Sequence, residues 1–244
     1  MERLKESYKV DFDTLDVSGK LSINVISRYM QELAAKHATR LGVSFMDGQD
    51  TPEIYWILSR VKYDIERYPV FNEKITVETY PAGCDKLFII RCFEIKDINE
   101  IVIGKITANY LLMDVKKQRP IKISSNVGEL AKFNFLYEGE KVNKVPLVKY
   151  PCREETRQVY YSELDYNGHM NNSNHIRWSI DMVTDELMNG KEIKSIEVNY
   201  NAPIMCGDKV KLMLQNKNDI YLISANNILS DKNYFNSKIT ISNK

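Results

Sequence analysis

The chain has 244 residues, of which 43% are hydrophobic and 27% are charged, and its 34 Lys and Arg residues nearly balance its 33 Asp and Glu residues. This composition is typical of a folded globular protein and excludes an intrinsically disordered chain, which combines low hydrophobicity with high net charge. A net charge of +1 gives no general electrostatic reason to bind nucleic acid or an anionic membrane. We therefore expect neither as a partner.

The sequence predicts no targeting or membrane-spanning segment. Its first residues are charged, and no run of 18 apolar residues occurs. The cysteines are scattered without a C-x-x-C pair, which favours structural thiols in a reducing compartment and indicates no zinc site. They are Cys84, Cys92, Cys152 and Cys206. We therefore expect a cytoplasmic protein without a metal site.

The first predicted helix begins after Ser22, a plausible N-cap, and continues to about Leu41, where Gly42 is a natural terminator. Apolar residues recur along it near helical spacing, so one face should be buried. Four strands rich in Val, Ile, Tyr, Phe and Thr should follow, with a break at Pro81–Gly83 among others. Their expected ranges are 54–65, 74–80, 87–95 and 101–115.

A second predicted helix begins near Asn172 and carries apolar residues at i, i+4, i+7 and i+11 up to Leu187, before Asn189 and Gly190 end it. Four further strands are expected, over 194–201, 208–215, 220–229 and 234–242. Strands this close in sequence pair as antiparallel hairpins. The expected fold class is therefore α+β, with one long helix against an antiparallel sheet, occurring twice.

An internal repeat supports this division. At an offset of 149 residues, segment 15–21 aligns with 164–170, and Leu, Asp and Gly are identical in register. The helix follows at the same distance in both copies, and Tyr29 aligns with Trp178. We therefore expect two units joined by a linker that crosses the surface. The expected ranges of the N-terminal unit, the linker and the C-terminal unit are 1–130, 131–155 and 156–244.

The start of the second helix holds the candidate catalytic site. Here Asp165, Asn167 and His169 stand where the first copy has an Asp, a Ser and a Lys. If this loop is extended, alternate residues point to one side, so the carboxylate, the amide and the imidazole would converge. Backbone N–H groups at the start of the helix are suited to an oxyanion. A general acid or base, a carbonyl polariser and an anion hole are what acyl transfer requires.

A purely structural interpretation of this loop stays open. Asp, Asn, Gly and His are common where helices begin, because they cap and turn the chain. For His37, in the first helix, the spacing favours a structural or surface role. His175 lies in the second helix, and nothing in the sequence assigns it a role.

The string D-x-N-x-H-x-N-N at 165–172 is the most specific stretch of the chain, and further segments that carry a family resemblance are 19–22, 31–38, 56–60 and 65–69. On these segments the chain resembles the acyl-acyl-carrier-protein thioesterases, a bacterial and plant family built as a tandem double hotdog. The resemblance covers nearly the whole chain. It implies two hotdog units, each a long helix wrapped by a curved antiparallel β-sheet.

The resemblance also implies an activity, the hydrolysis of the thioester of fatty acyl-acyl carrier protein, which releases free fatty acid in fatty acid biosynthesis. Acyl carrier protein would be the partner of a monomer or homodimer, with no metal ion and no bound cofactor. Asp165, Asn167 and His169 would be catalytic, and Asn171 and Asn172 would bind substrate. The N-terminal unit would lack a working site and would help form the acyl pocket.

The chain departs from the family pattern at one position. Many members carry a Glu on the strand after the second helix, shortly beyond a tyrosine that matches Tyr200, but here Pro203 stands about there. The role of this Glu is therefore vacant or passes to another residue, such as Glu197 or Glu163. Cys206 lies two residues too late to match the cysteine of the plant members.

Two mechanisms and two other functions stay open. Either Asp165 or His169 activates water, or Asp165 attacks directly and forms an acyl-enzyme anhydride. A thioesterase for acyl-coenzyme A or another small thioester is the alternative among enzymes. A non-catalytic acyl-binding or ligand-sensing protein is the alternative from a different class, and the absent Glu favours it.

Overall fold

The computed structural model describes residues 2–44, 54–122, 135–230 and 232–243, so residues 131–134 of the predicted linker lie outside the described residues. No helix in these ranges is long and apolar enough to cross a membrane. The chain divides into two compact units. Unit 1 comprises Met1–Val61 and Glu66–Val142, and unit 2 comprises Lys62–Ile65 and Asn143–Lys244.

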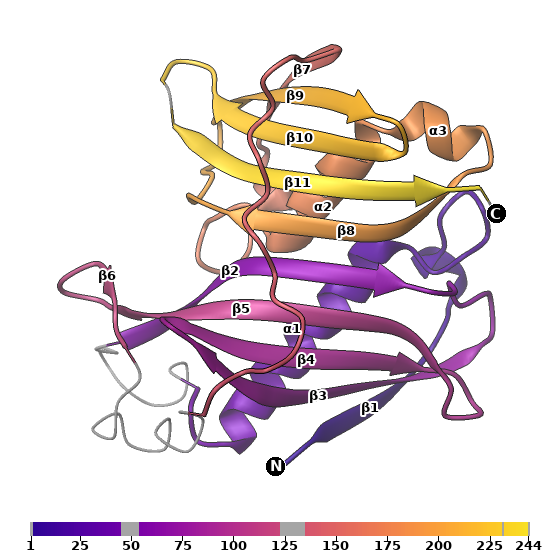
Figure 1. The fold of residues 1–244 in the computed structure, drawn as a ribbon, viewed down its shortest axis with the longest axis vertical. Coiled ribbons are helices and arrows are strands. Elements are labelled where there is room, and N and C mark those ends of the chain that lie inside the picture. The colour runs from indigo at the N-terminus through magenta and orange to yellow at the C-terminus, as the bar shows by residue number, and fades with distance from the viewer. Residues whose placement is uncertain (1, 45–53, 123–134, 231, 244) are drawn as a thin grey trace. The chain divides into compact units, whose positions relative to one another are not determined.

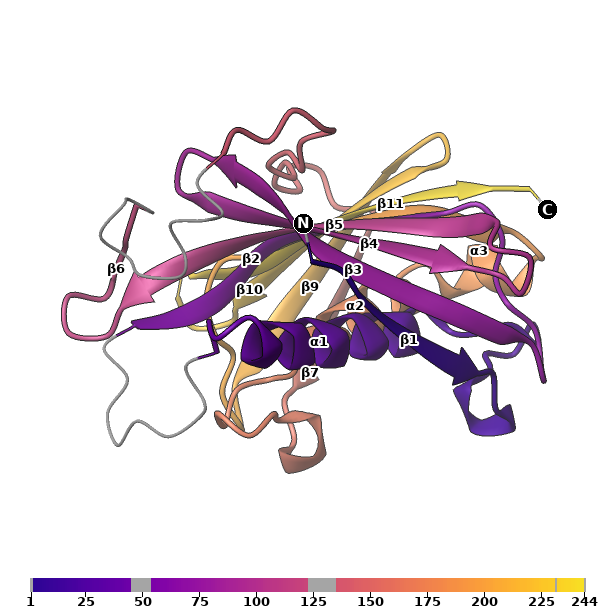
Figure 2. The same ribbon diagram turned by 90° about the horizontal axis from the view of Figure 1, so that it is seen from below.

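Unit 1 is a mostly antiparallel sheet with one long helix, α1 (Ile23–Arg40), along one face (Figure 1). The strand order is β1-β3-β4-β5-β2, and β6 pairs with β5. Figure 2 shows α1 running along the strands on that single face. The strands are β1 (Leu4–Lys9), β2 (Ile54–Ile65, of which the last four residues belong to unit 2), β3 (Lys74–Asp85), β4 (Phe88–Lys96), β5 (Val102–Asp114) and β6 (Arg119–Pro120).

Helix α1 confirms the predicted first helix and its two ends. Ser22 is the N-cap residue, and Gly42 follows the C-cap with φ +68°, a left-handed conformation that glycine adopts without strain. The buried side chains recur at helical spacing, which keeps one stripe of the helix against the sheet. They are Ile23, Ile26, Ser27, Met30, Leu33 and His37.

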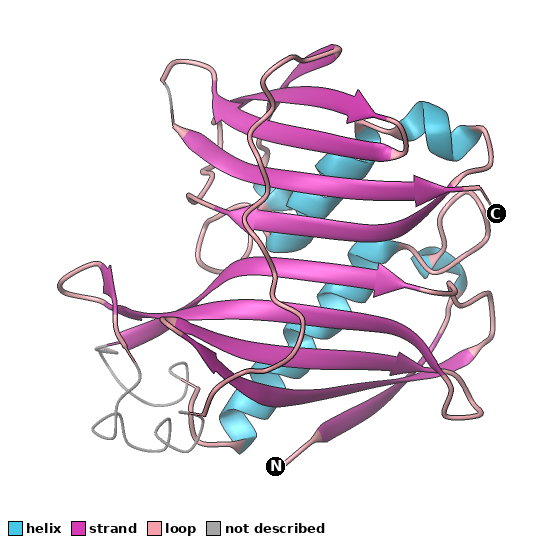
Figure 3. Ribbon diagram, viewed as in Figure 1, coloured by secondary structure: helices cyan, strands magenta, loops and turns pink. Residues whose placement is uncertain are grey.

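Unit 2 repeats this arrangement with shorter helices. Helix α2 (Asn172–Asp181) lies on one face of its sheet and is followed by α3 (Thr184–Met188) (Figure 3). The strand order is β8-β11-β10-β9-β7. The strands are β7 (Arg153–Gln158), β8 (Glu192–Tyr200), β9 (Lys209–Lys217), β10 (Ile220–Asn227) and β11 (Asn233–Ser242).

The predicted second helix is divided, so its predicted continuity is wrong. Helix α2 ends at Asp181, and Val183 leaves the helical region with φ −116° and ψ 21° before α3 begins at Thr184. The Thr184 hydroxyl donates to the Asp181 carbonyl at 2.8 Å and so competes with the helical backbone donor for that carbonyl. The apolar spacing continues across the break, and periodicity therefore does not reveal it.

Three elements recur at the predicted offset of 149 residues. The strand β1, the 3-10 turn Phe12–Thr14 and α1 begin 149 residues before β7, the 3-10 turn Tyr161–Glu163 and α2. The sequence pattern predicts neither β1 nor β7. Each is a six-residue edge strand with several charged residues, in which half-buried and exposed positions alternate. Such edge strands lack the apolar pattern of internal strands.

Residues 143–150 lie across the sheet of unit 2 on the face opposite α2 (Figure 1). The Val145 N–H donates to the Asn199 carboxamide oxygen at 2.6 Å, and the Val148 N–H donates to the Ser224 hydroxyl at 2.9 Å. Buried polar side chains of the sheet thus accept hydrogen bonds from backbone N–H groups that are not paired with a neighbouring strand. The ranges expected for the two domains and the linker stay predictions.

The predicted break at Pro81–Gly83 is wrong, because β3 continues to Asp85. The pairing of β3 with β4 shifts register between Pro81 and Gly83, which marks a β-bulge. Gly83 has φ +121°, and a Cβ atom added to it would lie 2.8 Å from the carbonyl oxygen of Phe135. The bulge therefore needs glycine both for its backbone conformation and for space.

We predict that Gly83→Ala destabilises the protein more than Gly19→Ala. Both glycines have positive φ, but a Cβ at Gly19 would have no heavy atom within 4 Å. The Gly19 control therefore carries only conformational strain, about 1–2 kcal/mol, whereas Gly83→Ala adds a steric clash of about 1–3 kcal/mol. Urea unfolding of both variants measures the difference, and equal losses would contradict the steric argument.

Candidate active site

The segment Asp165–His169 is a tight turn just before α2, so the condition that this loop is extended is not met. The Asp165 N–H donates to the His169 carbonyl at 2.7 Å, and the Gly168 N–H donates to the Asp165 carbonyl at 3.0 Å. Gly168 has φ +75°, which glycine adopts without strain. The alternation of a strand therefore cannot be what brings the three candidate side chains together.

The Asp165 carboxylate closes this turn. Its Oδ1 atom accepts from the Asn167 N–H at 2.9 Å and from the His169 N–H at 3.3 Å, as in an Asx turn. The three predicted catalytic residues thus share one turn, although no hydrogen bond within the described part of the chain joins their side chains to one another. Asn167 is exposed and His169 is half-buried. Both are therefore within reach of a ligand from solvent.

Unit 1 contains the same turn. There the Asp16 N–H donates to the Lys20 carbonyl at 2.8 Å, and the Asp16 Oδ1 atom accepts from the backbone N–H groups of Ser18 at 2.8 Å and Lys20 at 3.4 Å. The two turns share these backbone hydrogen bonds and differ at the positions of Tyr166, Asn167 and His169. In unit 1 the Ser18 hydroxyl also donates to the Asp16 Oδ1 atom at 2.6 Å. The Asp-capped turn is therefore a feature of the fold, and any chemistry peculiar to unit 2 comes from the amide and the imidazole.

The predicted substrate-binding residues begin α2. Asn171 is the N-cap residue, and its Oδ1 atom accepts from the N–H of Ser173 at 2.9 Å and from its hydroxyl at 2.8 Å. The Asn172 carbonyl accepts from the Tyr200 hydroxyl at 3.3 Å. The Asn172 N–H donates no hydrogen bond to any residue that the structure describes. The Asn172 N–H lies at the positive end of the helix dipole, where the sequence predicts a binding site for an oxyanion.

The segment after β8 lies beside the turn. The Met170 N–H donates to the Ile204 carbonyl at 2.9 Å, and His169 forms an isolated β-bridge with Met205. Pro203, at the position of the family Glu, immediately precedes this contact and is exposed. The fold thus brings the segment in which the family carries its Glu to the turn, but Pro203 has no carboxylate.

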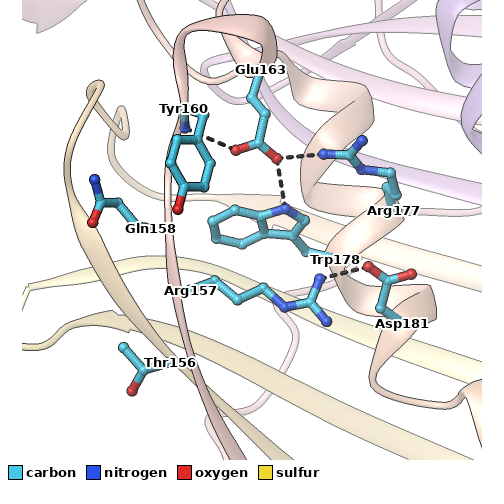
Figure 4. A pocket seen from close by; sticks show the side chains of 8 residues that line it. All are labelled: Thr156, Arg157, Gln158, Tyr160, Glu163, Arg177, Trp178 and Asp181. Carbon is cyan, nitrogen blue, oxygen red and sulfur yellow. Dashed lines mark hydrogen bonds and ion pairs between the residues drawn. The ribbon is translucent and has the colours of Figure 1, made fainter.

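Both alternative carboxylates are engaged in ion pairs. Glu197 on β8 pairs with Lys238 at 2.9 Å. Glu163, which stands two residues before Asp165, is buried, accepts from the Trp178 indole N–H at 2.9 Å and pairs with Arg177 (Figure 4). Neither is a free carboxylate at the turn.

A groove of about 460 Å³ lies beside Glu163, between β7 and α2 (Figure 4). Its lining residues are Thr156, Arg157, Gln158, Tyr160, Glu163, Arg177, Trp178 and Asp181. The three predicted catalytic residues are not among them, so the groove flanks the turn without containing it. In the described ranges, no group of three or more His, Cys, Asp or Glu side chains could hold a metal ion.

His175 supports the start of α2. Its Nδ1 atom lies 3.1 Å from the Asn171 carbonyl, and its ring packs edge-on against Tyr200 and Phe235. Burial lowers the pKa of His175 to about 4, and the hydrogen bond to Asn171 opposes this shift. The imidazole is therefore neutral at pH 7, with Nδ1–H donating to the carbonyl.

His37 is buried in unit 1, in agreement with the structural role that the sequence favours. Arg91 donates to its Nδ1 atom at 2.8 Å. Burial, followed by the nearby Arg91 charge, lowers the pKa of His37 to about 4. Since Arg91 has only protons to donate, the neutral ring carries its own proton on Nε2.

Two family profiles match the chain. The one described as "Acyl-ACP thioesterase N-terminal domain" matches residues 2–130, and "Acyl-ACP thioesterase C-terminal domain" matches residues 151–243.

The oleoyl-acyl carrier protein thioesterase of Coriandrum sativum chloroplasts is 23% identical over 223 residues, covering 84% of this chain and 60% of the relative. The palmitoyl-acyl carrier protein thioesterase of Cuphea hookeriana chloroplasts is 24% identical over 199 residues, covering 76% and 48%. The chain thus spans 48–60% of the lengths of these two relatives.

Solved structures show the same fold. An acyl-ACP thioesterase from Bacteroides thetaiotaomicron superposes with a TM-score of 0.87 at 21% identity, covering 98% of each chain. A 12:0-ACP thioesterase from Umbellularia californica also has a TM-score of 0.87, at 16% identity, covering 99% of this chain and 98% of the other. These likenesses confirm the expected fold of two tandem hotdog units.

We predict that the free energy of unfolding falls as the pH drops from about 6.5 towards 4. His37 and His175 are neutral when folded, with pKa values of about 4 against an ordinary value of 6.5, so each takes up a proton on unfolding in this window. Each contributes a slope of up to about 1.4 kcal/mol per pH unit, with stability rising as the pH rises.

Urea unfolding at several pH values measures this slope. His175→Phe keeps an aromatic ring against Tyr200 and Phe235, and should remove one histidine's share of the slope. His37→Phe should remove a similar share, and the double variant should lose both. A slope unchanged in both single variants would show that neither buried imidazole governs the pH dependence.

Proposed function

The chain belongs to the acyl-ACP thioesterase family, whose N-terminal and C-terminal domain profiles match residues 2–130 and 151–243, and from this we propose that it hydrolyses the thioester of fatty acyl-acyl carrier protein. The products are a free fatty acid and the thiol of the carrier, as a step of fatty acid biosynthesis. The named thioesterases among its relatives support the substrate class. A cytoplasmic location, as a monomer or a homodimer, is part of this proposal.

The observation that carries the proposal is the difference between the two Asp-capped turns. Both turns are closed by the same backbone hydrogen bonds to an Asp carboxylate, and both have a Gly with positive φ, so these two residues account for the shared turn. The second turn adds Asn167 and His169, which supply an amide donor and a proton-transfer group beside the first N–H of α2. Unit 1 has Ser18 and Lys20 there, which favours one active site per chain.

In the proposed mechanism, the thioester carbonyl oxygen accepts hydrogen bonds from the Asn167 side chain and the Asn172 N–H. His169 takes a proton from water, whose oxygen attacks the carbonyl carbon, and the C–S bond breaks as the same proton passes to the leaving thiolate. Asp165 holds the turn through Oδ1, which is engaged with two backbone donors. Asn171 caps the helix that carries the oxyanion donor.

Unit 1 is proposed to bind the acyl chain without taking part in the chemistry. The alternatives are a thioesterase for acyl-coenzyme A or another small thioester and, from a different class, a non-catalytic acyl-binding protein. Pro203 in place of an acidic residue favours the non-catalytic alternative, because it removes one candidate general base from the segment beside the turn. Tight binding of an acyl thioester without thiol release would support that alternative.

We predict that Asp165→Ala, Asn167→Ala and His169→Ala each lower the rate of thiol release by about 100-fold or more, because each removes a positioning, polarising or proton-transfer group. The assay is colorimetric detection of the carrier thiol with acyl-acyl carrier protein as substrate. Asp16→Ala is the matched control, since it removes the same turn-capping carboxylate from unit 1.

The control separates chemistry from folding. Asp16→Ala and Asp165→Ala should lower the melting temperature by similar amounts, but only Asp165→Ala should stop turnover. Near-normal turnover in both Asp165→Ala and His169→Ala would refute the proposed site.

We also predict a higher kcat/KM for the carrier-protein form of an acyl chain than for its coenzyme A form, by about tenfold or more, because remote contacts with the carrier add binding energy. Carrier proteins are acidic, and an exposed basic cluster surrounds the β5–β6 turn, formed by Lys116, Lys117, Arg119 and Lys122. The double variant Lys116→Glu/Arg119→Glu should lower kcat/KM for the carrier form and leave the coenzyme A form unchanged. Equal kcat/KM values for both forms would favour the small-thioester alternative.

A further inference from the structure

Glu163 makes more hydrogen bonds around the candidate site than any catalytic candidate does. Its carboxylate is buried, with Oε2 accepting from the Tyr160 N–H at 3.0 Å and Oε1 accepting from the Trp178 indole N–H at 2.9 Å and from Arg177. Figure 4 shows the three donors converging on this one carboxylate, with Tyr160 just before the 3-10 turn Tyr161–Glu163 and Arg177 and Trp178 on α2. Tyr160 precedes the turn and the other two follow it, so the carboxylate bridges both sides.

The backbone of Glu163 makes a second bridge. Its carbonyl accepts from the Asn171 N–H at 2.9 Å and from the Asn174 side chain at 2.8 Å. Side chain and carbonyl together link residue 163 to the N-cap and to the first two turns of α2. The residues enclosed between these contacts are 164–170, the loop that contains Asp165, Asn167 and His169.

Unit 1 provides an internal comparison. At the offset of 149 residues, Thr14 stands at the position of Glu163, and its carbonyl accepts from the Ser22 N–H at 3.0 Å, as the Glu163 carbonyl does from Asn171. The Thr14 hydroxyl, however, donates only to the nearby Asp11 carbonyl. The backbone bridge therefore belongs to the fold, because both units have it. The carboxylate bridge occurs only in the unit that carries the amide and the imidazole.

We infer that Glu163 is a positioning residue that holds the start of α2 in place relative to the Asp165–His169 turn. The inference rests on the proposed function, for which the Asn172 N–H and the side chains of Asn167 and His169 must keep fixed relative positions. Helix α2 has ten residues and ends at Asp181, whereas α1 has 18 residues. The shorter helix has fewer packing contacts of its own to hold its first turn in place. Three donors within unit 2 occupy the Glu163 carboxylate, and we assign to it no role as the base that activates water.

The test compares Glu163→Ala and Glu163→Gln with Thr14→Ala, the matched control at the equivalent position of unit 1. With acyl-acyl carrier protein as substrate, Glu163→Ala should lower kcat by about 10–100-fold and change KM by less than about threefold, because misplaced groups lose transition-state contacts. Glu163→Gln keeps a carbonyl acceptor for Trp178 and should recover part of kcat, with the wild-type midpoints of the pH–rate profile. Thr14→Ala should keep the wild-type kcat.

A second measurement reports the structure of the Asp165–His169 turn independently of enzyme activity. The backbone amide NMR signals of Asn167 and His169 should shift in Glu163→Ala and stay unchanged in Thr14→Ala. Wild-type kcat in folded Glu163→Ala, or unshifted amide signals, would overturn the inference. Equal inactivity of the Gln and Ala variants, with loss of the acid limb of the pH–rate profile, would also overturn it and assign Glu163 as the general base. If Asp165→Ala and His169→Ala keep turnover in the same assay, the proposed function fails, whatever the Glu163 variants do.

Discussion

The hydrogen bonds that the Asp165 carboxylate accepts from the backbone N–H groups of Asn167 and His169 determine how the chain passes from the β7 edge of the sheet into α2. A helix start leaves backbone N–H groups without partners, and the turn before it must place them without burying them unpaired. The carboxylate closes the turn, after which Asn171 caps the helix through Ser173. The position of the first free N–H of α2, and of the amide and imidazole beside it, depends on this sequence of contacts.

A comparison of the two hotdog units distinguishes residues that the fold requires from residues that the proposed chemistry requires. Asp16 closes the turn of unit 1 with the same bonds, and the backbone link from the 3-10 turn to the helix N-cap is also common to both. These shared features belong to the hotdog unit. The features found only in unit 2 are the amide, the imidazole and the buried Glu163 carboxylate that binds α2. They lie within a few residues of one another, as expected for parts that act together.

Most buried polar side chains of the described residues are neutral, and the buried carboxylates of Glu78, Glu163 and Glu197 form ion pairs. His175 stays neutral by donating to a carbonyl, and His37 stays neutral by accepting from Arg91. Arg91 is itself buried, forms no ion pair within the described ranges, and also donates to Thr79. Burial lowers the pKa of Arg91 because it disfavours the charged form. A neutral imidazole as acceptor avoids placing a second charge in the interior, where each charge is costly to desolvate.

Features that depend on local patterns could be predicted from the amino-acid sequence. These are the repeat at an offset of 149 residues, both ends of α1, most internal strands and the place of the segment that carries Asp165, Asn167 and His169 before the second helix. Helical spacing, caps and apolar strands are properties of neighbouring residues, so they can be recognised without knowing the fold.

Features that depend on distant partners could not be predicted from the amino-acid sequence. Strands β1 and β7 form because a sheet edge is available to pair with, although their own residues are charged. Phe135 leaves no space for a side chain at Gly83, and the break after α2 interrupts an apolar spacing that continues through it. The position of Ile204 beside Met170, and of Trp178 on Glu163, follows from packing between elements. Spacing along the chain carries no information on such contacts, because they arise only when separate elements bury their surfaces against each other.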